Sequence, residues 1–558
     1  MRAPFVLAAG LLAVALGIAA AQAPAEAPAF NIEVRNAAVG DLLQQLNRSA
    51  GVALRADGWC FDQRVTLAAR NVTVADVQAA LASLFHATWR EDGTLASDPE
   101  WLGEVEAYRR RRDTQLVAAI HRIRTGIERG QPSRYAARLA AEVRARHPDL
   151  AGELAQPSLD YLRHATLILA LDRSVVPTLV RIGSVAIPFS RLPVGLRPVV
   201  TRFVMANLPP EDVAWILDGG PYPTSLGALP RVLEPRLEYH LLYGDAVTGP
   251  MLLVRAGLPD SWATVIFPGT LAVLPSSREL FPPAPVELDD PALLRRIARP
   301  LDLAALDWDQ GLLALAQATG LKIVADAYLR PPLFATTPRT FEAQGLTVKE
   351  ALDHFARRHR AFWWKQGGWV CFRREFWLDE TRVAVPERRL RQLGDTLATQ
   401  TRLTDEQLDW LASLRDEQLL TLHLAGSVAA GGQAPPLAAF DLNEVELVRQ
   451  ALLFWQTLLP EQREMAVQSG LPAALMQPLQ LQSYLRIGLE RGYPPDPAAP
   501  GGTNFRVYHS FRRSADDRHF VGALLFEMGF APGVSRTARL ALQLPAPRTP
   551  RQNAPASP

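Results

Sequence analysis

The stretch Gly51-Val-Ala-Leu-Arg-Ala-Asp57 decides the fold, because it returns later in the chain as Gly320-Leu-Lys-Ile-Val-Ala-Asp326. In both places a glycine follows an amphipathic helical pattern and precedes an apolar strand pattern. Glycine adopts at low cost the positive φ at which helices commonly end. Leu42 and Leu46 lie on one face of the first predicted helix, and Leu315 takes the same place in the second. The recurrence predicts two diverged copies of one unit.

The residues around each stretch predict the order β-α-β-β-α-β. In the first copy Phe30 to Val34 alternates as a strand does, and Ala87 to about Arg90 is the last strand. Between them Thr73-Val-Ala-Asp76 is a capping box that opens the second helix. In the second copy Leu301 to Leu303 is expected to be the first strand, and Thr347-Val-Lys-Glu350 repeats the capping box.

These two modules resemble the short N-terminal domain of secretins and TonB-dependent signalling receptors, called STN. That family shows Leu-x-x-Leu before Gly-Val or Gly-Leu, and then Val-Thr/Ser-Val-x-x-Ala-Leu. The matching pieces here are Val72-Thr-Val74 with Ala80-Leu81, and Leu346-Thr-Val348 with Ala351-Leu352. The resemblance implies an envelope protein-interaction module rather than an enzyme. Neither a secretin channel region nor a receptor barrel follows, so neither parent function carries over.

Each module is expected to precede a mainly helical segment and a β-hairpin. The hairpin strands begin at Leu237 and Met251 in the first copy and at Phe505 and His519 in the second, and the gapless pair 208–220 and 458–470 predicts matching capped helices. The predicted fold class is therefore α+β, built by tandem duplication. The expected division is a signal peptide (1–21), the first STN-like module (29–95), its helical segment and hairpin (100–282), the second module (298–376), its helical segment and hairpin (385–547) and a disordered tail (548–558).

The N-terminus has the pattern of a secretory signal peptide. Arg2 precedes an apolar run from Phe5 to Ala20, and small residues follow. The run is shorter than the roughly 20 residues that a membrane-spanning helix needs. Cleavage after Ala21 is expected, with an uncleaved anchor as the alternative. We therefore expect a periplasmic or extracellular protein without a transmembrane segment after cleavage.

Charge and aromatic residues supply the candidate binding residues. The net charge of +2 indicates no polyanionic partner, and nucleic acid is not expected for an exported protein. A basic run on a predicted helix is either a solvated face or a contact for anionic envelope polymer. An aromatic cluster at the end of the second module either fills the core or offers a platform for a glycan or partner chain. The candidate binding residues are Arg109, Arg112, Trp364, Trp369, Phe376 and Trp377.

The sequence carries no catalytic or metal-binding motif. His-Glu-x-x-His, Gly-x-Ser-x-Gly and glycine-rich phosphate loops are missing, so no catalytic residue, metal ligand or cofactor is expected. Cys60 and Cys371 either form a disulfide between the copies or remain two buried thiols. The expected function is that of a non-catalytic envelope adaptor that binds envelope protein or cell-wall polymer. The alternatives are an envelope hydrolase with a site of dispersed residues and a structural assembly subunit.

Overall fold

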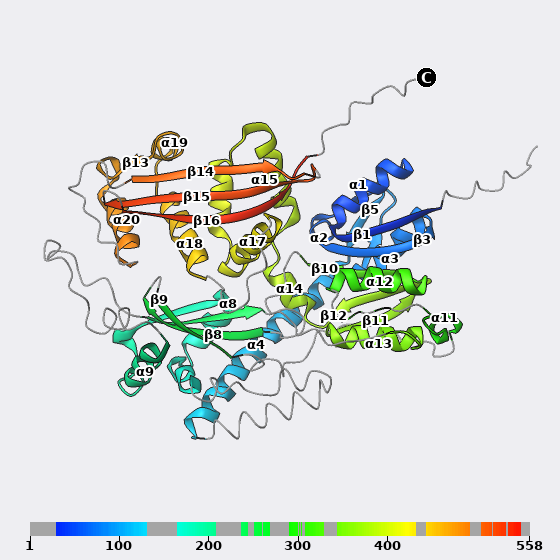
Figure 1. The fold of residues 1–558 in the computed structure, drawn as a ribbon, viewed down its shortest axis with the longest axis horizontal. Coiled ribbons are helices and arrows are strands. Elements are labelled where there is room, and N and C mark those ends of the chain that lie inside the picture. The colour runs from blue at the N-terminus through cyan, green and yellow to red at the C-terminus, as the bar shows by residue number, and fades with distance from the viewer. Residues whose placement is uncertain are drawn as a thin grey trace, which may run out of the picture.

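The computed structural model describes most of the chain between residues 29 and 547 (Figure 1). The described residues are 29–130, 164–207, 236–243, 250–258, 261–267, 290–298, 301, 303, 307–328, 343–430, 442–490, 504–515, 517–531 and 534–547. The expected signal peptide (1–21), the expected helix at 208–220 and the expected tail (548–558) lie outside them.

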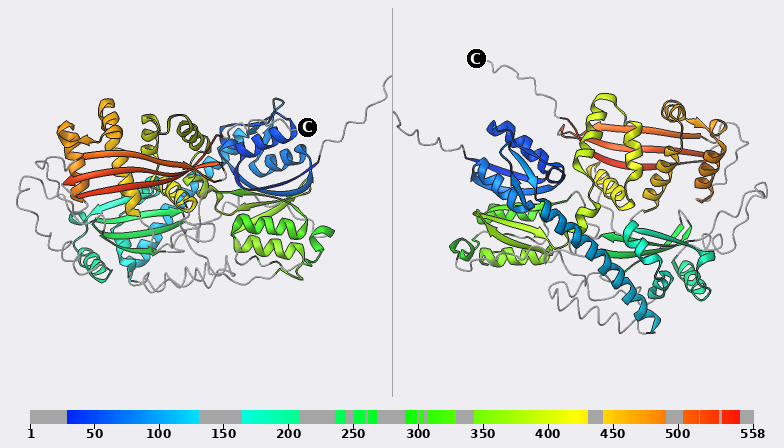
Figure 2. Two further views of the ribbon diagram at one scale, coloured as in Figure 1. Left: turned by 45° about the horizontal axis from the view of Figure 1, so that its top comes forward. Right: turned by 180° about the vertical axis from the view of Figure 1, so that it is seen from behind.

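A five-stranded sheet joins the two predicted modules. Across the sheet the strands are β1 (Phe30–Ala38), β3 (Arg64–Val72), β10 (Lys322–Ala327), β12 (Trp369–Arg374) and β11 (Ala361–Gln366). The two modules meet where β3 pairs antiparallel with β10, with Ala68 opposite Ile323. The segments expected as separate modules therefore share one sheet, and their blue and green elements lie side by side in Figures 1 and 2.

The helices of the two modules cover opposite faces of this sheet. One face carries α1 (Val39–Ala50) and α3 (Val74–Phe85), and the other carries α12 (Trp308–Thr319) and α13 (Val348–Arg358). In β10, Val324 packs in the core with α1 and α3, whereas Ile323 and Ala325 pack in the core with α12 and α13. Successive side chains of a strand point to opposite faces, so a strand covered on both sides is apolar almost throughout.

The local signals around these helices are confirmed. Thr73 and Asp76 form a reciprocal capping box at the start of α3, and Thr347 and Glu350 form one at the start of α13. Gly51 ends α1 at a φ of 67°, and Gly320 ends α12 at a φ of 70°. These features depend on residues within one helical turn of each other, which is why the sequence predicts them correctly.

The predicted strand order needs correction in both modules. In the first, a further strand follows the last predicted one across a turn at Gly93, whose φ is 76°. Leu301 and Leu303, expected in the first strand of the second module, lie outside any strand, and the Leu301 carbonyl accepts from the Ala343 amide instead. The extra strand belongs to a small separate sheet of β2 (Arg55–Ala56), β5 (Thr94–Ser97) and β4 (Ala87–Trp89), next to α2 (Gly58–Phe61).

A long helix, α4 (Pro99–Glu128), leads from the first module to a second group of elements. The sequence predicts an arginine-rich helix here, and its described part is confirmed. The expected hairpin that follows is part of a larger antiparallel sheet in the order β6 (Ser184–Pro188), β7 (Arg236–Tyr243), β8 (Pro250–Leu258) and β9 (Ser261–Phe267). The helical elements of this part are η2 (Ala165–Ala170), α8 (Val175–Ile182), η3 (Phe189–Arg191) and α9 (Arg197–Asn207), and α11 (Pro291–Leu294) precedes the second module.

The C-terminal part repeats this sheet order. Its antiparallel sheet runs β13 (Leu471–Pro472), β14 (Asn504–Arg513), β15 (His519–Ala531) and β16 (Val534–Pro545). The second expected hairpin, β14 with β15, is therefore also part of a larger sheet. In each sheet one more apolar strand follows the predicted pair: β9 in the first sheet and β16 in the second. The helices are α14 (Trp377–Val383), α15 (Glu387–Gln400), α16 (Asp405–Ser413), α17 (Asp416–Ala429), α18 (Leu442–Gln456), α19 (Pro460–Gln468), the short η7 (Ala473–Leu475) and α20 (Pro478–Glu490).

The fold class is α+β, with helices and several small sheets in one chain. Within the described ranges, no helix combines the length and the apolar character that crossing a membrane requires.

Candidate functional site

Most of the predicted binding residues lie inside the protein. Trp369, Phe376, Trp377 and Arg112 are at most 3% exposed, while Arg109 and Trp364 are partly buried. The three aromatic side chains therefore fill the core and do not form a surface platform. For Arg112, both the solvated face and the polymer contact are wrong, because its side chain is buried.

Several of these residues fasten α4 to α14, the helix that follows the second module. The ring of Trp101 on α4 stacks on Trp377, with ring centroids 5.9 Å apart. Arg112 Nη2 lies 2.8 Å from Asp379 Oδ2, and Arg109 Nη2 donates to Thr381 Oγ1 over 3.2 Å. Charge-assisted hydrogen bonds of this kind offset the cost of burying a guanidinium group.

The two-residue period of a strand predicts that Phe362 and Trp364 lie on one face and Trp363 on the other, and the structure confirms this alternation. Phe362 and Trp364 share one face of β11 and stack with ring centroids 5.8 Å apart. Trp363 points to the other face, where its indole nitrogen donates to Asp353 Oδ1 over 2.9 Å. Only Trp364 of this trio is partly exposed.

The two cysteines do not form the disulfide offered as one alternative. Cys60 on α2 and Cys371 on β12 are both free thiols, each fully buried in the core that α1 and α3 cover. Burial raises the pKa of the Cys371 thiol to about 12 and raises that of Cys60 well above its usual range. Two protonated, enclosed thiols behave as small apolar side chains.

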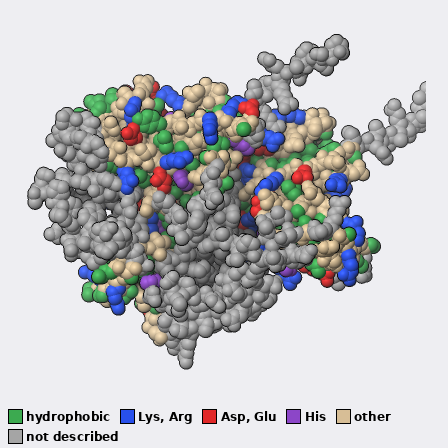
Figure 3. All heavy atoms as spheres, viewed as in Figure 1, with side chains coloured by type: hydrophobic (Ala, Val, Ile, Leu, Met, Phe, Trp, Pro, Cys, Tyr) green, Lys and Arg blue, Asp and Glu red, His purple; other side chains and the backbone are tan. Residues whose placement is uncertain are grey.

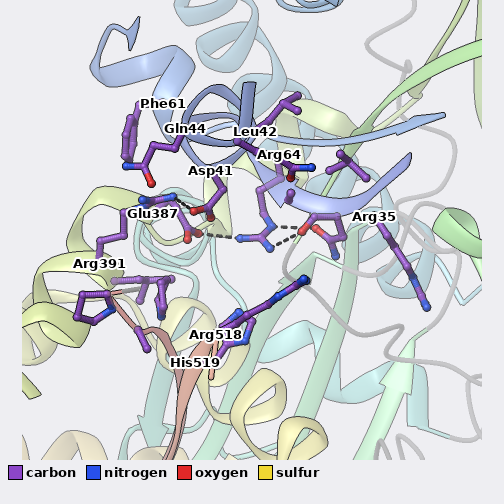
Figure 4. A pocket seen from close by; sticks show the side chains of 18 of the residues that line it. Arg35, Asp41, Leu42, Gln44, Phe61, Arg64, Glu387, Arg391, Arg518 and His519 are labelled. Atoms are coloured by element: carbon purple, nitrogen blue, oxygen red, sulfur yellow. Dashed lines mark hydrogen bonds and ion pairs between the residues drawn. The ribbon is translucent and has the colours of Figure 1, made fainter. Parts of the chain in front are cut away.

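A cleft of about 710 Å³ lies where the first module meets the C-terminal part of the chain. One wall is formed by β1 and α1, and the other by α15 together with the adjoining ends of β15 and β16 (Figure 4). Its lining is mostly charged or amide side chains, and Val34, Leu42, Phe61 and Leu390 are among the apolar exceptions. The sequence does not predict this cleft, because its residues come from segments hundreds of positions apart.

Ion pairs cross the base of the cleft. Arg64 Nη1 lies 2.7 Å from Glu387 Oε2, and the Glu387 side chain is only 5% exposed. The same guanidinium donates to the side-chain and main-chain oxygens of Asn36, over 2.8 Å and 2.5 Å. Asp41 of α1 pairs with Arg391 of α15. The inner charges of the cleft are therefore paired with opposite charges, as Figure 4 shows for Arg64 and Glu387.

The rim of the cleft carries exposed polar groups. Arg35, Gln44 and Arg48 are exposed, and Arg518 and His519 project from the opposite side (Figure 4). On the face seen in Figure 3, basic and acidic side chains are interspersed rather than gathered by sign. The cleft therefore suits a ligand with hydrogen-bonding groups along its length better than a simple polyanion.

Carboxyl groups with a raised pKa lie outside the cleft lining. Burial raises the pKa of Asp326 and of Asp309, and such groups are the usual choice for acid–base catalysis. Asp326 Oδ2 accepts from the Tyr328 hydroxyl over 2.5 Å, and Asp309 accepts from the Thr66 hydroxyl. Neither carboxyl lines the cleft. Among the described residues, no group of three or more His, Cys, Asp or Glu side chains is placed to hold a metal ion.

Comparison with models of known families, with curated proteins and with solved structures finds no match for this chain. The cleft is therefore the feature of the molecule from which a function can be inferred. A sequence signal for one wall exists in Glu387-Arg-Arg-Leu-Arg391, where charged residues at i and i+4 share a helix face. The other wall has no comparable signal.

Proposed function

We propose that the chain is an exported, non-catalytic binding protein that holds an envelope ligand, either a protein segment or a cell-wall polymer, in the cleft between the first module and the C-terminal part. The observation that carries this proposal is the cleft of about 710 Å³ with its polar lining. Concave sites of this size with a few convergent polar groups are the usual places where proteins bind ligands.

The pairing of charges inside the cleft favours binding over catalysis. Glu387 is engaged by Arg64, and Asp41 by Arg391. Both carboxylates are thus already engaged by guanidinium groups of the protein itself. The two acids instead keep their partner arginines in place, so that the walls present a fixed pattern of donors and acceptors to a ligand.

The proposal also includes export of the protein and the STN-like character of its two modules. The signal-peptide pattern at residues 1–21 supports export, and the two STN-like motif sets support an interaction module of the envelope. The matched order of the two four-stranded sheets supports descent from a duplicated unit.

The test blocks the cleft without altering its ion pairs. Gln44 is exposed on α1 and lines the cleft, so Gln44→Trp fills the space with an indole ring. Glu104→Trp places the same ring on an exposed position of α4, which does not line the cleft, and serves as the matched control. The probes are soluble peptidoglycan fragments and a display library of short peptides, with binding followed by calorimetry.

The expected result is a ligand that loses at least about tenfold in affinity for Gln44→Trp while its affinity for Glu104→Trp equals that for the wild type. Equal binding by both variants would place the ligand elsewhere and contradict the proposal. Turnover of any probe by the wild type would favour the hydrolase alternative instead.

A further inference from the structure

The open edge of β1 runs along the cleft. β1 is the terminal strand of the five-stranded sheet. Residues 33–37 all line the large cleft, and residues 31–33 line a second hollow of about 150 Å³ at the end of α12. Consecutive side chains of a strand point to opposite faces, so a run of consecutive lining residues places the open space along the edge of the strand. The backbone of β1 therefore borders the large cleft, whereas the second hollow is lined by residues 68–70 of β3 as well.

The hydrogen bonds at both ends of β3 show which β1 groups face the open edge. The Val39 amide donates to the Gln63 carbonyl over 2.9 Å, and the Asn71 amide donates to Asn31 Oδ1 over 3.0 Å. Odd-numbered residues of β3 thus direct their backbone groups toward β1. In an antiparallel ladder, residues alternate between exchanging both hydrogen bonds and exchanging none.

Glu33 is therefore a residue whose backbone faces away from β3. Ile32 and Val34 lie opposite the odd-numbered Ala69 and Leu67, whereas Glu33 lies opposite Ala68. Ala68 also pairs with Ile323 of β10, which is the direction its backbone groups take. The amide and carbonyl of Glu33 consequently point out of the sheet edge, and those of Arg35 follow by alternation.

A bulge ends the open edge on its C-terminal side. Asn36 has a φ of 44°, its amide donates to Thr66 Oγ1 over 3.0 Å, and its carbonyl accepts from Arg64. The backbone of the bulge is thus satisfied within the protein. Within the part of the chain that the structure describes, the segment that remains open runs from Phe30 to Arg35, a length typical of a strand.

The edge of β16 differs from that of β1, because side chains of the protein accept hydrogen bonds from its outward amides. β16 is also a terminal strand, yet its Arg539 amide donates to the Glu444 side chain and its Ala541 amide donates to His423 Nδ1 over 3.3 Å. Among the residues that the structure describes, no side chain accepts from the Glu33 amide. An uncovered strand edge is a template for pairing with another chain.

We infer that the edge of β1 from Phe30 to Arg35 receives an extended polypeptide segment, which adds a sixth strand to the sheet. This inference rests on the proposed function and narrows the ligand of the cleft to a protein. Backbone amides and carbonyls of a strand edge match those of another extended chain, and alternate side chains of that chain would point to the α1 face and the α12 face of the sheet. A glycan repeats hydroxyl groups instead of the alternating amide and carbonyl groups that pair with a strand edge.

The experiment uses the full chain and a matched pair of substitutions at one position. Glu33→Pro removes the outward amide and places the proline ring on the edge, where a strand tolerates proline. Glu33→Ala removes only the side chain, which accepts from Gln317 Nε2 over 3.3 Å, and keeps the amide. The probe is the tightest peptide selected from a display library of peptides of about six to ten residues, the length of a strand.

We expect the peptide to bind the wild type and Glu33→Ala equally and to lose at least about tenfold in affinity for Glu33→Pro, the equivalent of one backbone hydrogen bond. The two Glu33 variants should share one Tm, whereas Val34→Pro, which removes an inward amide, should lower it. If Glu33→Pro fails to fold, hydrogen exchange on the wild type decides, because the peptide should slow exchange at Glu33 and Arg35.

Equal affinity for both Glu33 variants, unchanged exchange at these amides, or a selection that yields no peptide would overturn the inference. The outcomes also separate it from the proposed function. If peptidoglycan fragments bind the wild type and lose their affinity for Gln44→Trp, the cleft is a binding site and only the strand pairing is wrong. If neither peptides nor fragments bind, both proposals fail.

Discussion

Asp62 shows how single residues tie distant parts of this chain together. Its Oδ1 accepts from the main-chain amide of Arg388, 326 residues further on, over 3.0 Å. That amide belongs to the first turn of α15, whose N-cap residue is Pro386 and has no capping side chain of its own. Unpaired amides at a helix start need an acceptor, and a carboxylate there also meets the positive end of the helix dipole. Asp62 of the first module therefore caps α15 of the C-terminal part.

At this scale, Asp62→Ala should lower the free energy of unfolding by about 1 kcal/mol, the usual cost of a lost N-cap. Asp62→Asn should restore most of that loss, because an amide oxygen caps as well as a carboxylate does. Urea denaturation of the three proteins checks the order. A full loss in the asparagine variant would show that the salt bridge with Arg388, 3.2 Å away, matters more than the cap.

Among the elements, α17 approaches its sheet unusually closely. A Cβ atom added at Gly426 would lie 2.3 Å from the Leu542 amide nitrogen and 2.6 Å from the Ala541 carbonyl oxygen of β16. These contacts are backbone atoms, which cannot rotate away. The glycine therefore lets the helix rest directly on the edge strand, where His423 of the same helix accepts from Ala541. The cost of glycine in a helix is offset by this contact.

Gly426→Ala should destabilise the protein by about 1–3 kcal/mol, as overpacking does, although alanine is the better helix former. Gly103 of α4 is the control, because a Cβ added there meets nothing within 4 Å. Gly103→Ala should instead stabilise by up to about 1 kcal/mol. Thermal unfolding of both variants measures the contrast, and equal shifts of the same sign would contradict the close approach of α17 to β16.

On the scale of the whole molecule, a buried ion cluster joins the two four-stranded parts. Arg255 of β8 donates through Nε to Glu238 of β7 over 2.8 Å, and its Nη2 lies 2.9 Å from Glu446 of α18. Arg255 is 3% exposed and Glu238 5%. Burial alone would raise the pKa of Glu238, but Arg255 and His240 outweigh it and hold that pKa at about 2.

This depressed pKa predicts how Glu238 affects stability against pH. The carboxylate is favoured in the folded state, so its contribution is complete above the ordinary value of 4.5 and is lost as the pH falls from there through about 2. Glu238→Gln should cost about 3 kcal/mol at neutral pH, near the lower end for breaking a buried pair, since Glu446 remains. Urea titrations across this range should show the two proteins converging in acid. A difference independent of pH would contradict the ion-pair explanation.

The candidate site was beyond prediction for a physical reason. Each wall is an ordinary local element, and α1 was predicted from its leucine spacing. The site exists only because α15 lies across from α1 and Asp41 pairs there with Arg391. Such pairs depend on chain packing rather than on spacing along the chain. The surface platform predicted for the aromatic cluster was wrong for the same reason, since the burial of Trp377 depends on Trp101 of a separate helix.

Tandem duplication and the STN resemblance stay predictions. The two capping boxes, the two glycine helix ends and the two four-stranded sheets in matching order are consistent with a repeated unit. Both modules also carry a hairpin after their second helix, β4 with β5 in the first and β11 with β12 in the second. Among the described residues they differ in that the first module also contributes the pair of β1 and β3.

The sequence by itself determined the α+β class, the starts and ends of the main helices and the alternation of the aromatic strand. These follow from contacts within one helical turn or from the two-residue period of a strand. Only the tertiary structure decided that β3 joins β10, that Cys60 and Cys371 stay free, and that the edge of β1 borders a cleft. Those outcomes depend on which surfaces of distant segments bury each other, and no local pattern specifies that choice.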